Sequence, residues 1–259
     1  MKLSVITGKI GSGKSTILSS IRDLGGVCYS MDELSNIVLQ VLLVEEVLAF
    51  CGDQAVLISD NIQISHVYQS IFEAWKRFPD ENINDFILQK QHGQSINLTK
   101  RLATLKALTQ RNAPLPPIID KKKLTTAILD KPFLLQQLED MIYPITLRLA
   151  LHYLHQEFSL HRTTLYLEHP LVKLDTLLNE LQNVLYRFFI IEINANLRKS
   201  RLHHRNVDTS LLQILEEKQD TELSVLLQRA KSQITRLHGN TSSLSARQII
   251  SVSEKSHTS

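Results

Sequence analysis

Short apolar runs alternate with stretches of helical periodicity from the first residues of the chain. Leu3–Ile6 forms the first apolar run. Apolar residues then recur at the spacing of one helix face: Ile17, Leu18, Ile21 and Leu24. Gly25 and Gly26 are typical of a helix end, and Val27–Tyr29 favours a second short strand. Strand, helix and strand in this order predict a βαβ unit and a parallel sheet with helices on both faces.

The same two patterns continue to the end of the chain. Further helices are predicted from Asp32 to about Phe50 and over residues 65–78, 98–111, 121–129, 133–158, 197–205 and 211–233. Strands are predicted at residues 2–7, 26–30, 163–168, 187–193 and near 232–236. We therefore expect an α/β fold with a five-stranded parallel sheet flanked by helices.

Residues 8–16 read GKIGSGKST and follow the first predicted strand directly. This is the pattern G-x-x-x-x-G-K-[ST] where a strand turns into a helix. Its glycines let several backbone N–H groups converge on one anion, and the helix adds the positive end of its dipole. Lys14 supplies charge for the outer phosphates, and Ser15 supplies a hydroxyl that can ligate Mg²⁺. The motif predicts a nucleotide-phosphate site.

Two carboxylates follow predicted strands at the sheet edge where ligands of parallel sheets bind. Asp32 lies just past the second strand, where a carboxylate can accept a hydroxyl proton or help hold Mg²⁺ through water. An N-cap is the alternative role for Asp32. Glu168 ends the third strand and can organise metal-bound water, with a solvated surface acid as the alternative.

A basic segment follows the strongest strand signal. Arg198, Arg201 and Arg205 are spaced by three and four residues, so a helix brings them onto one face. A polyanion would relieve their mutual repulsion, and planar guanidinium groups suit a lid that closes over phosphates. A solvated basic surface is the alternative. His203 and His204 have no nearby Cys or acidic partner, so we do not expect a zinc site.

Composition narrows the class of protein. With 43% hydrophobic and 21% charged residues, the chain resembles an ordinary globular protein, and a net charge of +3 is too weak to indicate nucleic acid. Cys28 and Cys51 match no metal or redox spacing, which favours a cytoplasmic location. We expect no signal peptide, and the apolar stretch 37–50 is too short and too interrupted to span a membrane.

Several segments, in this order, resemble the dephospho-CoA kinase family, whose members catalyse the last step of coenzyme A synthesis. The phosphate loop is followed by a strand and then Asp32, although Ser30 stands where the family has a further Asp. LEDMIYP at 138–144 resembles the family's LE-x-I-x-HP block, with Tyr143 at the usual His. LEHPLV at 167–172 resembles D-x-PLL, with Glu168 at the position of the Asp, but Lys173 stands where the family has an acidic residue. RLHHR at 201–205 resembles the lid motif R-L-x-x-R, and Gln219 and RAKSQITRLHG resemble its closing segment.

The resemblance implies a P-loop NTPase fold with a helical acceptor-binding lobe and a lid. It implies transfer of the γ-phosphoryl group of ATP, with Mg²⁺, to the 3′-hydroxyl of dephospho-CoA. Lys14 and Asp32 would be catalytic, with Arg205 closing over the phosphates beside Arg201. Residues for ATP would be Gly11, Ser12, Gly13, Lys14, Ser15, Thr16 and Arg201. Residues for the acceptor would be Asp32, Tyr143, Pro144 and Glu168, and the metal ligand would be Ser15.

The resemblance also implies a division of the chain. The kinase core would comprise residues 1–35 and 160–250, with a lid at about 196–225, and residues 251–259 would form a tail. The acceptor lobe would comprise 36–159 and carry an insertion at about 58–116. Two alternatives stay open: a nucleoside or nucleotide monophosphate kinase, and a catalytically weak nucleotide-binding regulator. We expect small-molecule substrates, no nucleic acid or membrane partner, and a monomer, with an oligomer as the alternative.

Overall fold

The computed structural model describes two compact units. The described residues are 2–52, 57–58, 61–75, 87–89, 95–97, 118–131, 133–160, 164–204, 209–238 and 242–255. The first unit comprises Met1–Asp32 and Leu154–Ser259, and the second comprises Glu33–Tyr153. Each unit is described by itself below.

The first unit is built on a five-stranded sheet in which every pairing is parallel, as the sequence predicts. In spatial order the strands are β2 (Val27–Ser30), β5 (Thr164–Glu168), β1 (Lys2–Thr7), β6 (Leu185–Glu192) and β7 (Ile234–His238). β1 lies in the centre of the sheet, so the glycine-rich loop leaves the sheet between β5 and β6. This is the edge at which parallel sheets bind ligands.

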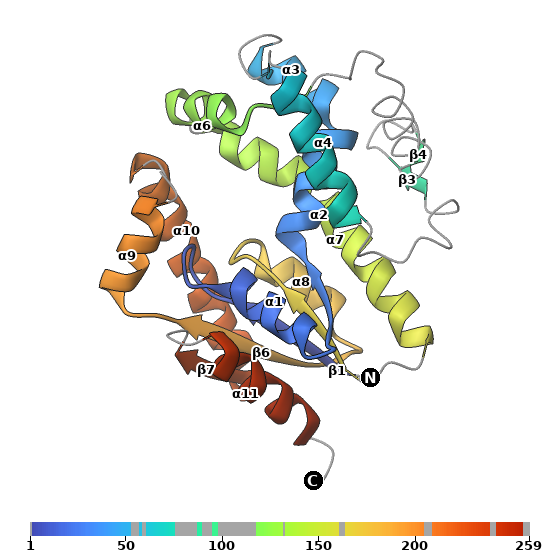
Figure 1. The fold of residues 1–259 in the computed structure, drawn as a ribbon, viewed down its shortest axis with the longest axis vertical. Coiled ribbons are helices and arrows are strands. Elements are labelled where there is room, and N and C mark those ends of the chain that lie inside the picture. The colour runs from blue at the N-terminus through green and yellow to red at the C-terminus, as the bar shows by residue number, and fades with distance from the viewer. Residues whose placement is uncertain are drawn as a thin grey trace. The chain divides into compact units, whose positions relative to one another are not determined.

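Helices cover both faces of this sheet (Figure 1). On one face α1 (Lys14–Asp23) packs against α11 (Ser242–Lys255). On the other face α8 (Leu174–Glu180) packs against α10 (Thr209–Arg229). Successive side chains of β6 point to opposite faces of the sheet, and Phe189 and Ile191 join the core beneath α1 and α11.

The remaining elements of the first unit follow the sequence closely. α9 (Ala195–His204) is the predicted basic helix, and η3 (Lys231–Gln233) leads into β7. The short helix α8 was not predicted. Residues predicted as a tail from 251 are helical as far as Lys255. This end of α11 is fixed to β1, because the Lys2 ammonium donates to the Ser253 carbonyl at 3.2 Å and the Ser4 and Ser253 hydroxyls lie 2.7 Å apart.

The described part of the second unit is mostly helical. Its elements are α2 (Met31–Ile37, beginning in the first unit), the π-helical turn η1 (Val38–Leu42), α3 (Val44–Cys51), α4 (Asn61–Trp75), the antiparallel pair β3 (Ile87–Gln89) and β4 (Ser95–Asn97), α6 (Lys121–Asp130), and α7 (Phe133–Ser159, continuing into the first unit). The helix predicted over 98–111 lies outside the described residues. No helix among the described residues has the length and apolar character needed to cross a membrane.

A buried glutamine explains the polar interruption of the long apolar stretch. Gln40 lies in η1 and is almost fully buried. Its side-chain amide donates to the Ile119 carbonyl at 2.9 Å and accepts from the Ile119 N–H at 2.9 Å. Because a buried amide is costly unless it is hydrogen-bonded, this paired contact fixes residues 118–119 against the helix.

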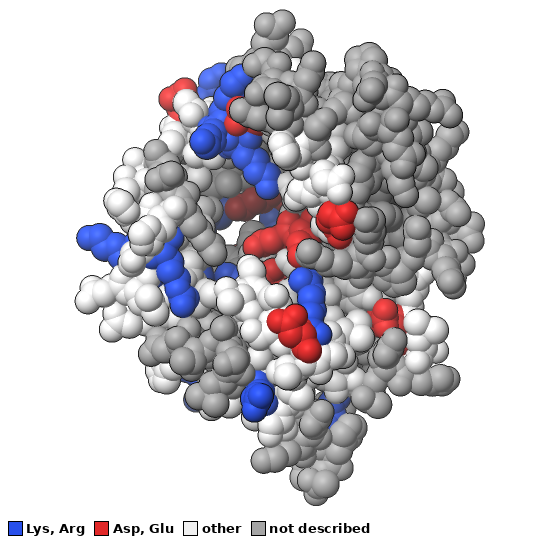
Figure 2. Space-filling view, viewed as in Figure 1, with Lys and Arg blue, Asp and Glu red and all other residues white. Residues whose placement is uncertain are grey.

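Charged side chains are interspersed on the face shown in Figure 2. Over the described residues of that face, Lys and Arg side chains and Asp and Glu side chains are all visible at the surface.

Candidate nucleotide-binding site

The glycine-rich loop joins the carboxyl end of β1 to the first turn of α1. Gly13 has φ 95° and ψ 16° and stands immediately before the helix. Gly8 has φ 151°, and a Cβ atom placed on it would lie 2.6 Å from the Ile191 carbonyl oxygen of β6. A side chain at Gly8 would therefore strain the backbone and collide with the neighbouring strand. These constraints explain why the motif requires glycine here.

The amino end of α1 is arranged to receive an anion. Its N-cap residue, Gly13, makes no side-chain cap hydrogen bond, and the first turn contains no acidic residue. The first N–H groups of a helix have no partner within the helix and carry its positive dipole end. Ser15 and Thr16 are exposed in this turn, so their hydroxyls are accessible to a ligand. The local geometry suits phosphate oxygens.

Lys14 directs its charge back into the loop. Its ammonium donates to the Gly8 carbonyl at 3.0 Å and to the Lys9 carbonyl at 3.4 Å, and the side chain is largely buried. Ser12 is also buried, and its hydroxyl has no hydrogen-bond partner among the described residues. An uncompensated buried hydroxyl is uncommon in folded proteins and is often found where a ligand or water binds. The loop thus offers a cation and a free hydroxyl close to the amino end of α1.

A buried polar pair lies at the carboxyl ends of β2 and β5. Ser30 and Glu168 are register partners in these strands, and the Ser30 hydroxyl donates a short hydrogen bond to the Glu168 carboxylate. Glu168 is only 1% exposed, which excludes the solvated alternative. Its other register partner is Ile6, one residue before the last position of β1. Two residues that depart from the family pattern therefore contact each other directly beside the strand that leads into the loop.

His169 is a functional candidate that sequence reasoning missed. Its side chain is fully buried, and its backbone N–H donates to the Ile6 carbonyl at 3.0 Å. The pKa of His169 is lowered to about 4, chiefly by burial and to a smaller extent by the nearby positive charge of Lys14, against a raising effect of the hydrogen bond to the Pro170 backbone. The imidazole is therefore neutral at pH 7. Only its position between Glu168 and Pro170, next to the predicted acid, pointed to it in the sequence.

Asp32 lies in the first turn of α2, at the same sheet edge. The helix begins at Met31, so Asp32 is inside it and is not its N-cap. The side chain is exposed, and among the described residues its carboxylate has no hydrogen-bond or ion-pair partner. A free carboxylate at the carboxyl end of β2 is available to a ligand bound at this edge.

The arginines of α9 divide between two roles. Arg201 approaches the loop, because its Nη1 lies 3.4 Å from the Ser12 carbonyl oxygen. A Cβ atom placed on Gly13 would lie only 2.8 Å from the same Arg201 Nη1. Arg198 is already engaged, because it donates to the Ile10 carbonyl at 2.9 Å and forms an ion pair with Glu216. Arg205 lies outside the described residues. Arg198 was expected to grip phosphate together with the other two arginines, and its contacts correct that expectation.

The remaining predicted residues belong to the second unit. Tyr143 is buried in α7, and Pro144 is exposed in the same helix, which continues through it without a break.

The sheet order, the loop between β1 and α1, and the flanking helices define the α/β fold of a P-loop kinase. A protein described as TT1252 from Thermus thermophilus has a similar structure, with a TM-score of 0.50 and 17% identity over 99% of this chain and 97% of that one. Dephospho-CoA kinase from Campylobacter jejuni is similar at a TM-score of 0.51 and 14% identity, over 99% of this chain and 100% of that one. At identities this low, the structural similarity shows a shared fold and nothing beyond it. No protein-family model matches the chain, and the search of curated proteins found no match.

The close approach at Gly8 generates a stability prediction. Gly8→Ala should lower the free energy of unfolding by more than Gly25→Ala, because both glycines have positive φ but only Gly8 would place its Cβ against another atom, 2.6 Å from the Ile191 carbonyl. We expect about 1 kcal/mol for the control and about 3 kcal/mol for Gly8→Ala. Urea unfolding of both variants measures the difference. Equal losses would show that β6 moves aside at little cost.

The buried imidazole generates a prediction of pH dependence. The pKa of His169 is lowered from 6.5 to about 4 in the folded protein. Between these two pH values, the imidazole is mostly protonated in the unfolded chain and mostly neutral in the folded protein. Stability is therefore lost on acidification, by about 2 kcal/mol between pH 7 and pH 5 at 1.36 kcal/mol per pKa unit.

His169→Asn should remove this part of the pH dependence, whereas His155→Asn, at an exposed position of α7, should retain it. Chemical denaturation of the three proteins at pH 7 and pH 5 provides the measurement. If His169→Asn loses as much stability on acidification as the wild type, another group carries the effect.

Proposed function

We propose that this protein is an ATP-dependent kinase that phosphorylates the 3′-hydroxyl of dephospho-CoA. The observation that carries the phosphotransfer part is the uncapped amino end of α1 with the Lys14 ammonium folded into the loop before it. Asp32 at the same sheet edge supplies a free carboxylate. The choice of acceptor is supported by the sequence resemblance of the loop, of the segments at 138–144 and 167–172, and of the lid.

In this proposal the loop and α9 bind the nucleotide. Backbone N–H groups from Gly11 to Thr16 hold the phosphates, and Lys14 stabilises negative charge on the transferring group. Arg201 approaches from α9, beside the loop backbone. Arg205, four positions before the described start of α10, would close over the outer phosphates and exclude water.

The loop also fits Mg²⁺. When bound to the phosphates, Mg²⁺ neutralises charge that develops on the transferring group. The exposed Ser15 hydroxyl would hold it, because Mg²⁺ bound to a nucleotide takes most of its ligands from phosphate and water. The described residues contain no cluster of three His, Cys, Asp or Glu side chains with metal-binding geometry, which agrees with a metal held chiefly by the nucleotide.

Asp32 would orient the acceptor hydroxyl and take its proton. A bond forms between the hydroxyl oxygen and the γ-phosphorus, the bond from that phosphorus to the β-phosphate oxygen breaks, and ADP leaves. Glu168, held by Ser30, presents a buried carboxylate at the neighbouring strand end. Tyr143 and Pro144 would contribute to the acceptor site.

The direct test is ADP release by the purified protein with Mg²⁺ and ATP, in the presence of dephospho-CoA and, separately, of adenosine and nucleoside monophosphates. We expect release that depends on dephospho-CoA. Turnover with a nucleoside monophosphate and not with dephospho-CoA would show that the protein is a kinase with a different acceptor from the one proposed. Tight ATP binding without turnover on any acceptor would indicate a nucleotide-binding regulator.

Substitution of Asp32 tests its chemical role. Asp32→Asn should leave ADP affinity within about twofold of wild type and lower turnover with dephospho-CoA about 10²- to 10⁴-fold, the usual contribution of a positioned general base. Asp23→Asn, at the exposed far end of α1, is the matched control and should leave both quantities unchanged. Steady-state kinetics and calorimetry measure them. Equal turnover in the Asp32 variant would show that the carboxylate takes no part.

A further inference from the structure

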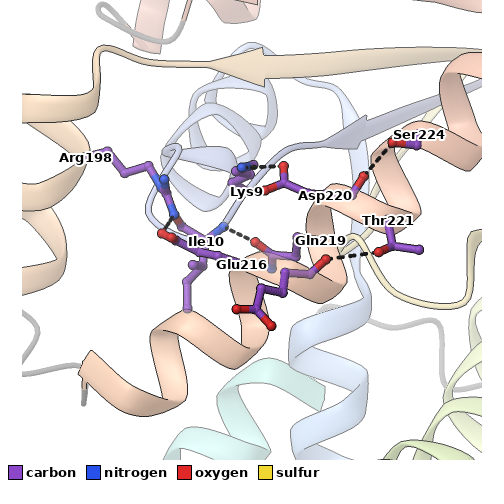
Figure 3. A network of polar contacts seen from close by, with 9 residues as sticks. Lys9, Ile10, Arg198, Glu216, Gln219, Asp220, Thr221 and Ser224 are labelled. Carbon is purple, nitrogen blue, oxygen red and sulfur yellow. Dashed lines mark hydrogen bonds and ion pairs between the residues drawn. The ribbon is translucent and has the colours of Figure 1, made fainter.

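Side chains from outside the phosphate motif bind both backbone groups of Ile10, at the crest of the loop. The Ile10 N–H donates to Gln219 Oε1 at 3.0 Å, and the Ile10 carbonyl accepts from Arg198 Nε at 2.9 Å (Figure 3). Gln219 belongs to α10 and Arg198 to α9, 209 and 188 positions further along the chain. Both of the side chains that bind Ile10 therefore come from helices outside the glycine-rich motif.

One face of α10 supplies the acidic and amide groups of this network. Glu216, Gln219 and Asp220 are spaced by three and four residues, so their side chains leave the helix on the same side. Glu216 pairs with the Arg198 guanidinium, and Asp220 pairs with Lys9 at 2.5 Å. These three positions of α10 thus reach Lys9, Ile10 and the arginine that binds the Ile10 carbonyl.

The contacts of this network differ in how strongly they stabilise the loop. The Lys9 and Asp220 side chains are 30% and 59% exposed, and ion pairs this open to solvent contribute little. Arg198 and Glu216 are 18% and 35% exposed, and Arg198 also holds a backbone carbonyl. Hydrogen bonds to a charged group are stronger than neutral ones. The Gln219 and Arg198 contacts to Ile10 are therefore the ones that fix the loop.

The loop needs such support because of its composition. Gly8, Gly11 and Gly13 are three of the six residues between β1 and α1, and glycine loses more conformational freedom on ordering than any other residue. A loop that is ordered only when a ligand arrives loses affinity by the free energy of that ordering. Anchoring the crest in advance removes part of that loss.

We propose that Gln219 and Arg198 are positioning residues that hold the crest of the loop in its phosphate-binding shape, with Glu216 orienting Arg198. This proposal rests on the proposed function only in that the loop binds a nucleotide. The proposal also gives the two arginines of α9 different roles, in which Arg198 supports the loop and Arg201 contacts the nucleotide. Any movement of α9 and α10 would then change the loop as well.

The first test needs no variant and no nucleotide. Hydrogen exchange of the wild-type protein should show the Ile10 amide protected at least about tenfold relative to an unstructured amide, because Gln219 binds it. Rapid exchange at Ile10 would overturn the tether.

The second test compares variants of α10. Gln219→Met keeps the shape of the side chain but removes the acceptor, so residues 8–13 should exchange faster while the exchange of β1 and β6 stays unchanged. ADP should bind about fivefold to tenfold more weakly, the effect of one hydrogen bond of ordinary strength. Gln219→Glu retains an oxygen acceptor and should restore protection at Ile10.

Thr221→Ala is the matched control, because the Thr221 hydroxyl only donates to the Glu217 carbonyl on the exposed side of the same helix. It should leave ADP affinity and loop exchange unchanged. The proposal is overturned if Gln219→Met binds ADP as tightly as Thr221→Ala, with the same exchange at residues 8–13. A wild-type protein that binds no ADP would instead refute the proposed function, and the exchange of Ile10 would still decide whether the tether exists.

Discussion

The turn between β1 and α1 is the constraint on which the rest of the site depends. Gly8 passes so close to the Ile191 carbonyl that no side chain fits between the loop and β6. That approach directs the chain back over the sheet edge and leaves the amino end of α1 uncapped. The position of Lys14, with its ammonium on the Gly8 and Lys9 carbonyls, follows from the same turn. Backbone geometry thus shapes the candidate anion site, and the lysine adds positive charge to it.

The polar residues beside this turn compensate one another. A buried carboxylate is costly unless it is hydrogen-bonded or paired, and Glu168 receives the Ser30 hydroxyl from the adjacent strand. The neighbouring His169 is kept neutral by burial and by the charge of Lys14. A second carboxylate at position 30 would have placed two acids side by side in the same buried corner. Serine at this position avoids that conflict and supplies the hydroxyl that Glu168 accepts.

The sequence predicted the sheet well because its signals are local. The strands of the first unit are short apolar runs next to clear turns, and the motif GKIGSGKST fixed where β1 ends and α1 begins. The π-helical turn at Val38–Leu42 was not predictable, because the polar residue within it, Gln40, is accounted for only by its contact with Ile119, which is distant in sequence. The short helix α8 was missed although Leu174, Leu177, Leu178 and Leu181 recur at the spacing of one helix face and are buried. Burial of Glu168 also depends on β2 and β5 becoming neighbours.

The arginine helix shows most clearly where local reasoning ends. Spacing placed Arg198 and Arg201 on one face of α9, and like charges on one face suggested a shared polyanion. The structure resolves the repulsion in another way, since Arg198 is neutralised by Glu216 from α10 and bound to the Ile10 carbonyl. An acid 18 residues away in sequence carries no periodic signal that would connect it to a particular arginine. The same residue type, three positions apart, therefore binds the Ile10 carbonyl and Glu216 in one case and lies against the Ser12 carbonyl in the other.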